Sequence, residues 1–235
     1  MESVPLVRDK HAHRERLSYE EYLALPDDGR IVEWVDGKII EHMPTTPSHQ
    51  RIVAFLLSLL RAYVFRLQLG EVLLAPMEVK LWPGGPSREP DVLFIGRARL
   101  SGLTERRFEG APDLVVEVIS PGSVTLDRID KFREYEQAGV GEYWIIDPRP
   151  HQEQADFYVR DAEGRFVPAP LSDDGVYAST VVPGFRLRVA WLWPAEPEAK
   201  LPDIDLALAW MLADAPGVSD ELRALYREML RLLSE

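Results

Sequence analysis

The segment Asp113-Leu-Val-Val-Glu-Val-Ile119 is the most informative part of this chain about its fold, because it is a β-branched, apolar run bracketed by Pro112 and Pro121. A run that is apolar on both of its alternating faces is typical of a strand buried inside an α/β layer. Alternation places three apolar residues on one face, Leu114, Val116 and Val118. Glu117 falls on the other face, where a charge is costly to bury unless it is paired, protonated or bound to a metal. The alternatives are that this face is open to solvent or that Glu117 pairs with an arginine.

A second carboxylate begins another predicted strand. Asp91 opens the run Asp91–Ile95 and shares its face with the apolar residues Leu93 and Ile95. Two adjacent strands that carry Asp91 and Glu117 could together hold one divalent cation, since hard ions prefer oxygen ligands. Taken alone, Asp91 could instead simply end the preceding Gly-Gly-Pro turn.

A lysine is the third candidate. The sequence predicts a helix over residues 127–138, in which Asp127, Lys131 and Tyr135 recur at i and i+4 on one side. A different, packed side of this helix is marked by Ile129 and Phe132. Lysine is rare here, with five among 27 cations, and its compact ammonium suits a group that faces a phosphate or activates water. The alternative is a solvated Asp127–Lys131 pair that contributes little.

Two further candidates come earlier in the chain. Glu33 falls in a strand that a tight Asp36-Gly37 turn joins to a second strand. The two strands of this hairpin are expected at residues 30–35 and 38–41. His49 lies on the first turn of a long amphipathic helix that Gly70 is expected to stop. Both side chains could line the same cleft, and a purely structural role is the alternative for each.

The remaining pattern completes an α/β layer with additions at both ends. A Ser18-x-x-Glu21 capping box predicts a short helix that ends before Pro26. Further strands are expected at 71–82 (interrupted by Pro76), 142–147, 157–159, 166–168 and 185–189. A loop over 97–110 carries four cations, Arg97, Arg99, Arg106 and Arg107. Helices at about 203–213 and 219–233 form a tail, the second with an apolar stripe. We therefore expect a flexible arm over 1–16, one domain over 17–195 and a helical extension over 196–235.

Composition limits the classes of protein that the chain can belong to. The 235 residues hold 27 Lys and Arg against 39 Asp and Glu, a net charge of −12, so a generalised attraction to nucleic acid is disfavoured. The absence of cysteine excludes disulfides and thiolate chemistry. The longest apolar stretch, Ile52–Leu60, is too short to span a bilayer, and the first twenty residues lack the apolar core of a secretion signal. We expect a cytoplasmic protein with no membrane contact.

Several motifs together resemble a known family. The string Ala111-Pro-Asp-Leu-Val-Val-Glu117-Val-Ile-Ser-Pro121 is followed by Asp127, Lys131, Tyr135 and Ala138-Gly-Val-Gly-Glu-Tyr-Trp-Ile-Ile-Asp-Pro148. With Pro90-Asp91, these residues closely resemble the Uma-two (Uma2) family of restriction endonucleases. Three N-terminal segments and one late segment also fit, Glu33-Trp-Val-Asp-Gly37, Met43-Pro44, Ser48-His49 and Val182-Pro-Gly-Phe185. The resemblance covers roughly residues 17–192, and the part from Pro112 to Pro148 is the most specific.

This resemblance implies a restriction-endonuclease-like fold, a mixed central sheet flanked by helices, of the PD-(D/E)XK nuclease superfamily. The acid before the second strand of that fold maps onto Asp91 and the acid of the third strand onto Glu117. The lysine expected two residues after the glutamate is replaced by Ile119, and Lys131 on the neighbouring helix is the candidate substitute. Glu33 matches a family glutamate that could add a third carboxylate to the metal site, and His49 is carried over as a further catalytic candidate.

The leading hypothesis is a Mg²⁺- or Mn²⁺-dependent phosphodiesterase that cleaves DNA, with the basic loop over 97–110 as a local binding patch. Nucleases of this superfamily commonly work as dimers, so a homodimer is expected. The competing hypothesis is a binding protein rather than an enzyme: a catalytically inactive module that keeps the fold and binds a protein or nucleic-acid partner. The replacement of the usual lysine by Ile119, the negative charge and the helical tail favour that alternative. A third possibility is hydrolysis of another phosphodiester or a nucleotide.

Overall fold

The computed structural model describes residues 16–25, 31–41, 45–193 and 202–233. Its central element is a six-stranded mixed sheet in the order β11-β10-β9-β8-β6-β3. The strands are β3 (Gly70–Leu74), β6 (Val92–Gly96), β8 (Leu114–Val118), β9 (Glu142–Asp147), β10 (Gln154–Arg160) and β11 (Phe166–Pro168). Within this sheet of the described chain, β8 and β9 pair in parallel and the other neighbours pair antiparallel. The predicted mixed central sheet is therefore confirmed.

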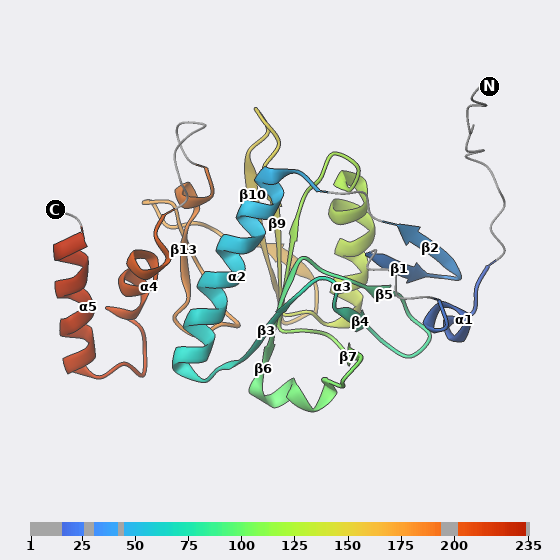
Figure 1. Ribbon diagram of the computed structural model, residues 1–235, viewed down its shortest axis with the longest axis horizontal. Coiled ribbons are helices and arrows are strands. Elements are labelled where there is room, and N and C mark those ends of the chain that lie inside the picture. Colours follow the sequence, from blue (N-terminus) through green and yellow to red (C-terminus); the bar gives the residue numbers. More distant parts are fainter. Residues whose placement is uncertain (1–15, 26–30, 42–44, 194–201, 234–235) are drawn as a thin grey trace, which may run out of the picture.

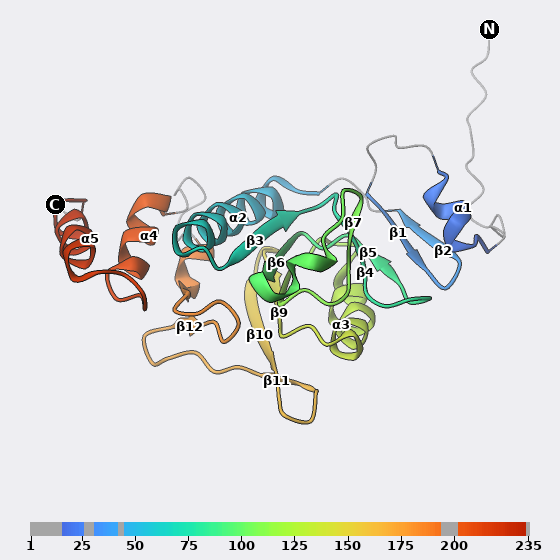
Figure 2. The ribbon, with the colours of Figure 1, turned by 90° about the horizontal axis from the view of Figure 1, so that it is seen from below.

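Helices cover both faces of this sheet (Figures 1 and 2). Helix α2 (Pro47–Leu67) packs on the face that carries Leu114, Val116 and Val118. The other face lies against a π-helical segment, η2 (Leu126–Lys131), and the helix α3 (Phe132–Ala138) that continues it. The alternation predicted for Asp113–Ile119 is confirmed, since Val115 and Ile119 belong to this second core cluster.

A second, five-stranded sheet adjoins the first in the order β2-β1-β5-β4-β7. Its strands are β1 (Val32–Val35), β2 (Lys38–Glu41), β4 (Glu78–Lys80), β5 (Ser87–Arg88) and β7 (Arg107–Glu109). The predicted hairpin is confirmed, with Asp36 at φ 49° and Gly37 at φ 81° in its turn. The capping box of Ser18 and Glu21 is also confirmed, and it begins α1 (Tyr19–Leu23) beside this sheet.

Three local predictions are wrong. The interruption expected at Pro76 is confirmed, but the two halves, β3 and β4, do not form one strand, because they belong to different sheets. Helix α2 is not stopped by Gly70, because Gln68 takes the left-handed conformation that ends it at φ 52°. Gly70 is instead required in β3, where a Cβ atom would lie 2.0 Å from the carbonyl oxygen of Ile95. The expected loop over 97–110 contains a short helix, η1 (Arg97–Gly102), and strand β7.

The C-terminal part packs against α2 rather than standing apart. The chain continues through β12 (Val176–Ala178), β13 (Arg186–Arg188), η3 (Val189–Leu192), α4 (Ile204–Leu212) and α5 (Asp220–Leu233). Buried residues of α4 belong to the same core cluster as those of α2, whereas α5 lies at the outer end of the molecule (Figure 1). The predicted boundary at 195/196 and residues 1–15 of the predicted arm over 1–16 lie outside the described residues, so this domain division stays a prediction.

A buried carboxylate joins the central sheet to the loop before β13, three residues along the β8/β9 pair from the position of Glu117. Glu142, at the start of β9, has no exposed surface and accepts bonds from the loop before β13. Its oxygens lie 2.6 Å from Oγ1 of Thr180, 3.0 Å from Oγ of Ser179 and 3.2 Å from the amide of Val181. Trp144 Nε1 also donates to Glu142, at 3.0 Å. Because these donors belong to β9 and to the loop before β13, Glu142 is a structural carboxylate that holds the loop against the sheet.

Candidate functional site

Two strand-borne carboxylates meet at one end of the central sheet. Val92 pairs with Val116 across β6 and β8, so Asp91 and Glu117 are the next residues at the same sheet edge. Oδ2 of Asp91 accepts the amide of Val118 at 2.7 Å, which holds Asp91 against the backbone beside Glu117. The predicted convergence of Asp91 and Glu117 is thus what the strand register produces.

Glu117 is held by two donors from the helical segment that covers it. Lys131 Nζ and the hydroxyl of Tyr135 each lie 2.8 Å from the same oxygen, Oε1. All three side chains are buried, with Lys131 only 1% and Glu117 only 3% exposed. The alternative of a solvated Asp127–Lys131 pair is therefore excluded, because the ammonium lies inside the protein and 3.5 Å from Asp127.

Each carboxylate of the pair keeps one oxygen without a hydrogen bond. Within the part of the chain that the structure describes, Glu117 uses Oε1 and leaves Oε2, whereas Asp91 uses Oδ2 and leaves Oδ1. Burial raises the pKa of the Glu117 carboxyl well above its ordinary value, Lys131 opposes this, and nearby Asp127 and Asp91 raise it further. The edge therefore combines unpaired acceptor oxygens with a local excess of negative charge.

Glu33 differs from Asp91 and Glu117 because both of its oxygens accept hydrogen bonds. Its Oε2 accepts from Nη1 of Arg88 at 2.8 Å, and its Oε1 accepts the amide of Glu89 at 3.0 Å and lies 3.2 Å from Lys131 Nζ. Burial lowers the pKa of Lys131, but Glu117, Glu33 and Asp127 outweigh burial and raise it above its ordinary value. Glu33 thus keeps Lys131 charged, and its part in a metal site stays a prediction.

His49 lies on the Asp91 side of the edge. Thr46 caps the first turn of α2 through the amide of His49, at 3.3 Å. The ring Nε2 lies 3.2 Å from Oδ2 of Asp91, and Nδ1 is buried without a hydrogen-bond partner. Side-chain contacts thus join Glu33, Lys131 and Glu117 in one group and His49 and Asp91 in another. The amide of Val118 and the pairing of β6 with β8 place the two groups side by side.

The π-helical turn of η2 explains how the lysine reaches the carboxylates. Its wide turn places Asp127 and Lys131 inward, where both are buried. The prediction that Ile129 marks a packed side is wrong, since Ile129 is 44% exposed. A period of 3.6 residues does not describe this turn, which is why the helical pattern misplaced that residue.

Arg88 contacts Glu33 and is itself paired with Glu134, although no pattern in the sequence predicts either Arg88 or Glu134 as a site residue. Arg88 lies in a two-residue strand without β-forming residues, and Glu134 stands on α3 one turn after Lys131. Nε and Nη2 of Arg88 donate to the two oxygens of Glu134 at 2.6 and 2.8 Å. The available signal was an arginine three residues before Asp91, which cannot be told from a surface cation without the fold.

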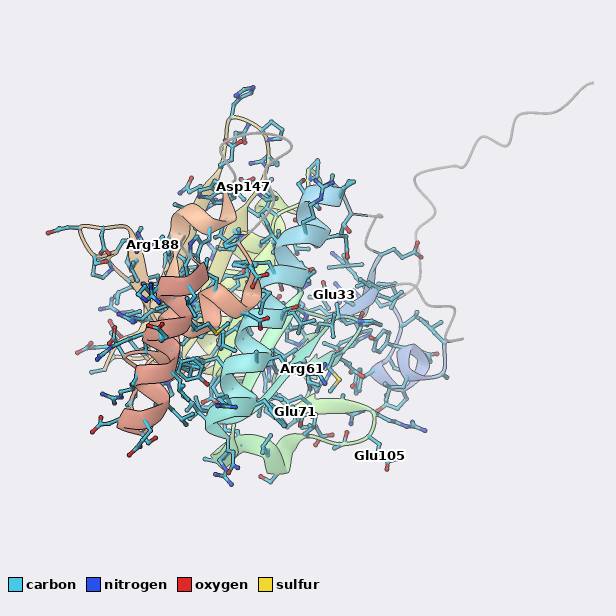
Figure 3. The ribbon with its side chains drawn as sticks, turned by 60° about the vertical axis from the view of Figure 1, so that its left-hand side comes forward. Glu33, Arg61, Glu71, Glu105, Asp147 and Arg188 are labelled. Atoms are coloured by element: carbon cyan, nitrogen blue, oxygen red, sulfur yellow. The ribbon has the colours of Figure 1, made fainter. Side chains whose placement is uncertain are left out.

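The basic stretch of residues 97–107 is not part of this edge. It begins where β6 ends, whereas Asp91 precedes the start of that strand. In Figure 3, Glu105 of this stretch lies far from Glu33 and from Asp147 at the end of β9. Arg99 also pairs with Asp113 at 3.2 Å, and Arg107 pairs with Glu109 at 2.8 Å. The structure thus does not bring this predicted patch to the site.

The donor set of the edge fits a hard divalent cation. No group of three or more histidine, aspartate and glutamate side chains within the described ranges is arranged to hold a metal ion. Mg²⁺, however, is usually bound by one or two carboxylates and completes its shell with water and substrate phosphates. Asp91 and Glu117, each with one uncommitted oxygen, match that mode of binding.

Comparison with known proteins places the chain in a family. The family model Uma2, described as "Putative restriction endonuclease", matches residues 19–190. The chain belongs to the Uma2 family. No match was found among curated proteins. The family resemblance inferred from the sequence is thereby confirmed, and the match covers most of the chain.

A solved structure supports the fold of this Uma2 protein. The crystal structure of a "putative nuclease belonging to DUF820" from Anabaena variabilis ATCC 29413 superposes with a TM-score of 0.59 at 19% identity. The match covers 74% of this chain and 96% of that chain. No helix in the described part of the Uma2 chain is long and apolar enough to cross a bilayer.

Tyr135→Phe is expected to weaken Mn²⁺ binding about tenfold, because partners that orient a ligand typically contribute 10- to 100-fold to affinity. Burial and the neighbouring Glu117 raise the pKa of Tyr135 well above its ordinary value, so its hydroxyl stays a donor to Glu117. Calorimetric titration measures the effect. Tyr143→Phe is the matched control, since it removes a buried hydroxyl that donates to the carbonyl of Asp127. Equal losses in the two variants would contradict an orienting role for Tyr135.

Proposed function

We propose that this Uma2 protein is a Mg²⁺- or Mn²⁺-dependent phosphodiesterase that cleaves DNA. The proposal depends on one oxygen of Asp91 and one of Glu117 that accept no hydrogen bond from the described residues, next to a buried ammonium that is hydrogen bonded to Glu117. Membership in a family described as restriction endonucleases supports the nuclease class. The reaction would be hydrolysis of a phosphodiester by water.

Asp91 and Glu117 would hold the cation, with Glu33 as the third carboxylate in the family pattern. When bound, such an ion supplies Lewis-acid polarisation of a phosphate oxygen and lowers the pKa of water. The amide of Val118 and the ring of His49 keep one oxygen of Asp91 occupied, while Lys131 and Tyr135 do the same for Glu117. The two carboxylates are therefore oriented before any ligand arrives.

Lys131 would offset the negative charge that grows on the phosphate as its bond to the leaving oxygen breaks. Three surrounding carboxylates raise the pKa of Lys131, so the group is charged at neutral pH and cannot act as a base. This favours electrostatic stabilisation over proton abstraction. Lys131 thus supplies from η2 the positive charge that Ile119 cannot supply, since an aliphatic side chain carries no charge.

The test is nicking of supercoiled plasmid DNA with Mg²⁺ or Mn²⁺, with and without EDTA. EDTA and Asp91→Asn are each expected to lower the rate by about 100-fold or more, since a metal contributes several kcal/mol to such reactions. Asp113→Asn is the matched control, because Asp113 accepts the amide of Gly96 at 2.6 Å at the opposite end of the same strand pair. Undiminished nicking by Asp91→Asn would contradict the proposed metal site.

The competing function is a catalytically inactive module that binds a partner, and the presence of Ile119 favours it. Titration of the wild-type chain with Mn²⁺ separates the two, since an inactive module has no need of binding that depends on Glu117. A panel of duplex DNA, single-stranded DNA, RNA and dinucleotides separates DNA cleavage from hydrolysis of other phosphodiesters. DNA as partner, the homodimer and the cytoplasmic location stay predictions.

A further inference from the structure

Arg88 connects three elements of the site through one buried guanidinium. It is 1% exposed, lies on β5, and donates one bond to Glu33 of β1 and two to Glu134 of α3. The two contacts to Glu134 engage both of its oxygens at 2.6 and 2.8 Å, a bidentate geometry that fixes orientation as well as distance. The planar guanidinium provides such a geometry, which a lysine cannot reproduce.

Both acceptors of Arg88 bear on Lys131. Glu33 gives Arg88 its Oε2 and turns Oε1 toward Lys131 Nζ, at 3.2 Å. Glu134 belongs to the next turn of the continuous helix that carries Lys131. Arg88 therefore fixes the carboxylate that Lys131 contacts and also the backbone from which Lys131 extends.

The Glu33 carboxylate interacts with two cations, Arg88 and Lys131. Without the guanidinium, the Glu33 carboxylate would lose the cation that binds its Oε2, while Lys131 would stay beside its Oε1. Lys131 Nζ lies between Oε1 of Glu33 at 3.2 Å and Oε1 of Glu117 at 2.8 Å. If Glu33 attracted the Lys131 ammonium more strongly, the ammonium would move away from Glu117 and from the end of the sheet at which Asp91 and Glu117 lie.

We propose that Arg88 is a positioning residue that keeps the Lys131 ammonium on Glu117 by holding Glu33 and Glu134. The inference rests on the proposed function for its catalytic consequence, but the placement of Lys131 can be measured without any activity. A merely structural role, in which Arg88 only joins β5 to α3, is the alternative that the experiment must exclude.

Two variants test the proposal, Glu134→Gln and Arg88→Lys. Glu134→Gln keeps the volume of the side chain but removes the bidentate ion pair, and it leaves the charge of Arg88 on Glu33. Arg88→Lys keeps a cation but cannot reach Glu33 and both oxygens of Glu134 together. Each is expected to lower kcat by about 10- to 100-fold, because small misplacements of catalytic groups cost that much. KM and the affinity for Mn²⁺ are expected to change little, since Asp91 and Glu117 are untouched.

The second measurement is the ¹⁵N–¹H signal of the Lys131 ammonium in lysine-labelled protein. A buried, hydrogen-bonded ammonium exchanges its protons slowly, and with five lysines the signal is assigned by Lys80→Arg and Lys131→Arg. In both test variants the Lys131 signal is expected to shift or to vanish through faster exchange. Arg88→Lys also adds a lysine, which Glu134→Gln does not, so the latter gives the cleaner spectrum.

Glu142→Gln is the matched control, because Glu142 is also a buried carboxylate with several donors but lies away from the site. It is expected to lower the melting temperature and to leave kcat and the Lys131 signal unchanged. If Glu134→Gln and Arg88→Lys behaved in the same way as Glu142→Gln, the positioning role would be overturned. If the wild-type chain cleaved no phosphodiester, the proposed function would fail, and the Lys131 signal would still decide what Arg88 does.

Discussion

Glu117→Gln is expected to abolish metal-dependent cleavage, with a loss of about 10³-fold or more, because the substitution removes a carboxylate that would hold the ion. The amide has the same shape, so it can keep Oε1 as an acceptor for Tyr135 and Lys131. The loss of activity would therefore result from the missing negative charge of the carboxylate beside Asp91, and not from a change of packing. Affinity for Mn²⁺ in calorimetric titration is expected to fall with the rate.

The same substitution is not expected to lower the melting temperature. Burial and the carboxylates around Glu117 raise its pKa, which means that the charged form is less favourable at this site than in water. A neutral amide relieves that cost, although Lys131 loses the charge of one partner. The exposed Glu109→Gln variant is the control for rate and stability. Full nicking activity in Glu117→Gln, or a large loss of stability, would contradict the assignment.

Lys131→Ala is expected to lower kcat by about 100-fold or more, while binding of Mn²⁺ is retained or strengthened. Removal of the ammonium takes away the charge proposed to stabilise the phosphate, but it leaves both uncommitted oxygens of Asp91 and Glu117 in place. It also leaves Glu33, Glu117 and Asp127 close together without their shared cation. The rate should therefore fall while the affinity for Mn²⁺ does not.

Stability provides the internal check on Lys131→Ala. Breaking a buried ion pair from one side typically costs about 3 to 5 kcal/mol, so the melting temperature of the metal-free variant should fall clearly. Added Mn²⁺ should restore part of it, because an ion that binds only the folded state stabilises that state. Lys131→Arg is the conservative variant, since it keeps the charge. Equal nicking by the wild type and Lys131→Ala would remove Lys131 from the mechanism.

The elements whose character is local could be predicted from the sequence. The alternation in Asp113–Ile119 predicts which face carries Glu117, and the hairpin at Asp36-Gly37 follows from the positive φ that both residues adopt. The capping box at Ser18 is likewise a property of four neighbouring residues. Each of these predictions depends on periodicity or turn chemistry within one segment, and each is confirmed.

The wrong predictions concern choices between local alternatives. Gln68 and Gly70 could each end α2, and the decision rests on the pairing of β3 with β6, which leaves no room for a side chain at Gly70. The division of residues 71–82 depends on which sheet each half can join. The exposure of Ile129 follows from a π-helical turn, which the apolar pattern does not signal.

Residue type and spacing are enough to predict that acids and a rare lysine stand on strands and a helix of an α/β domain, because both are local properties of the chain. The partner of each charged side chain depends on how the sheets and helices pack. Glu33, Arg88 and Glu134 come from positions as far as about 100 residues apart, and the short strand of Arg88 carries no recognisable pattern. Contacts of this kind arise when sheets and helices close around a shared interior, where a charge must find its counter-charge among whatever the fold brings near.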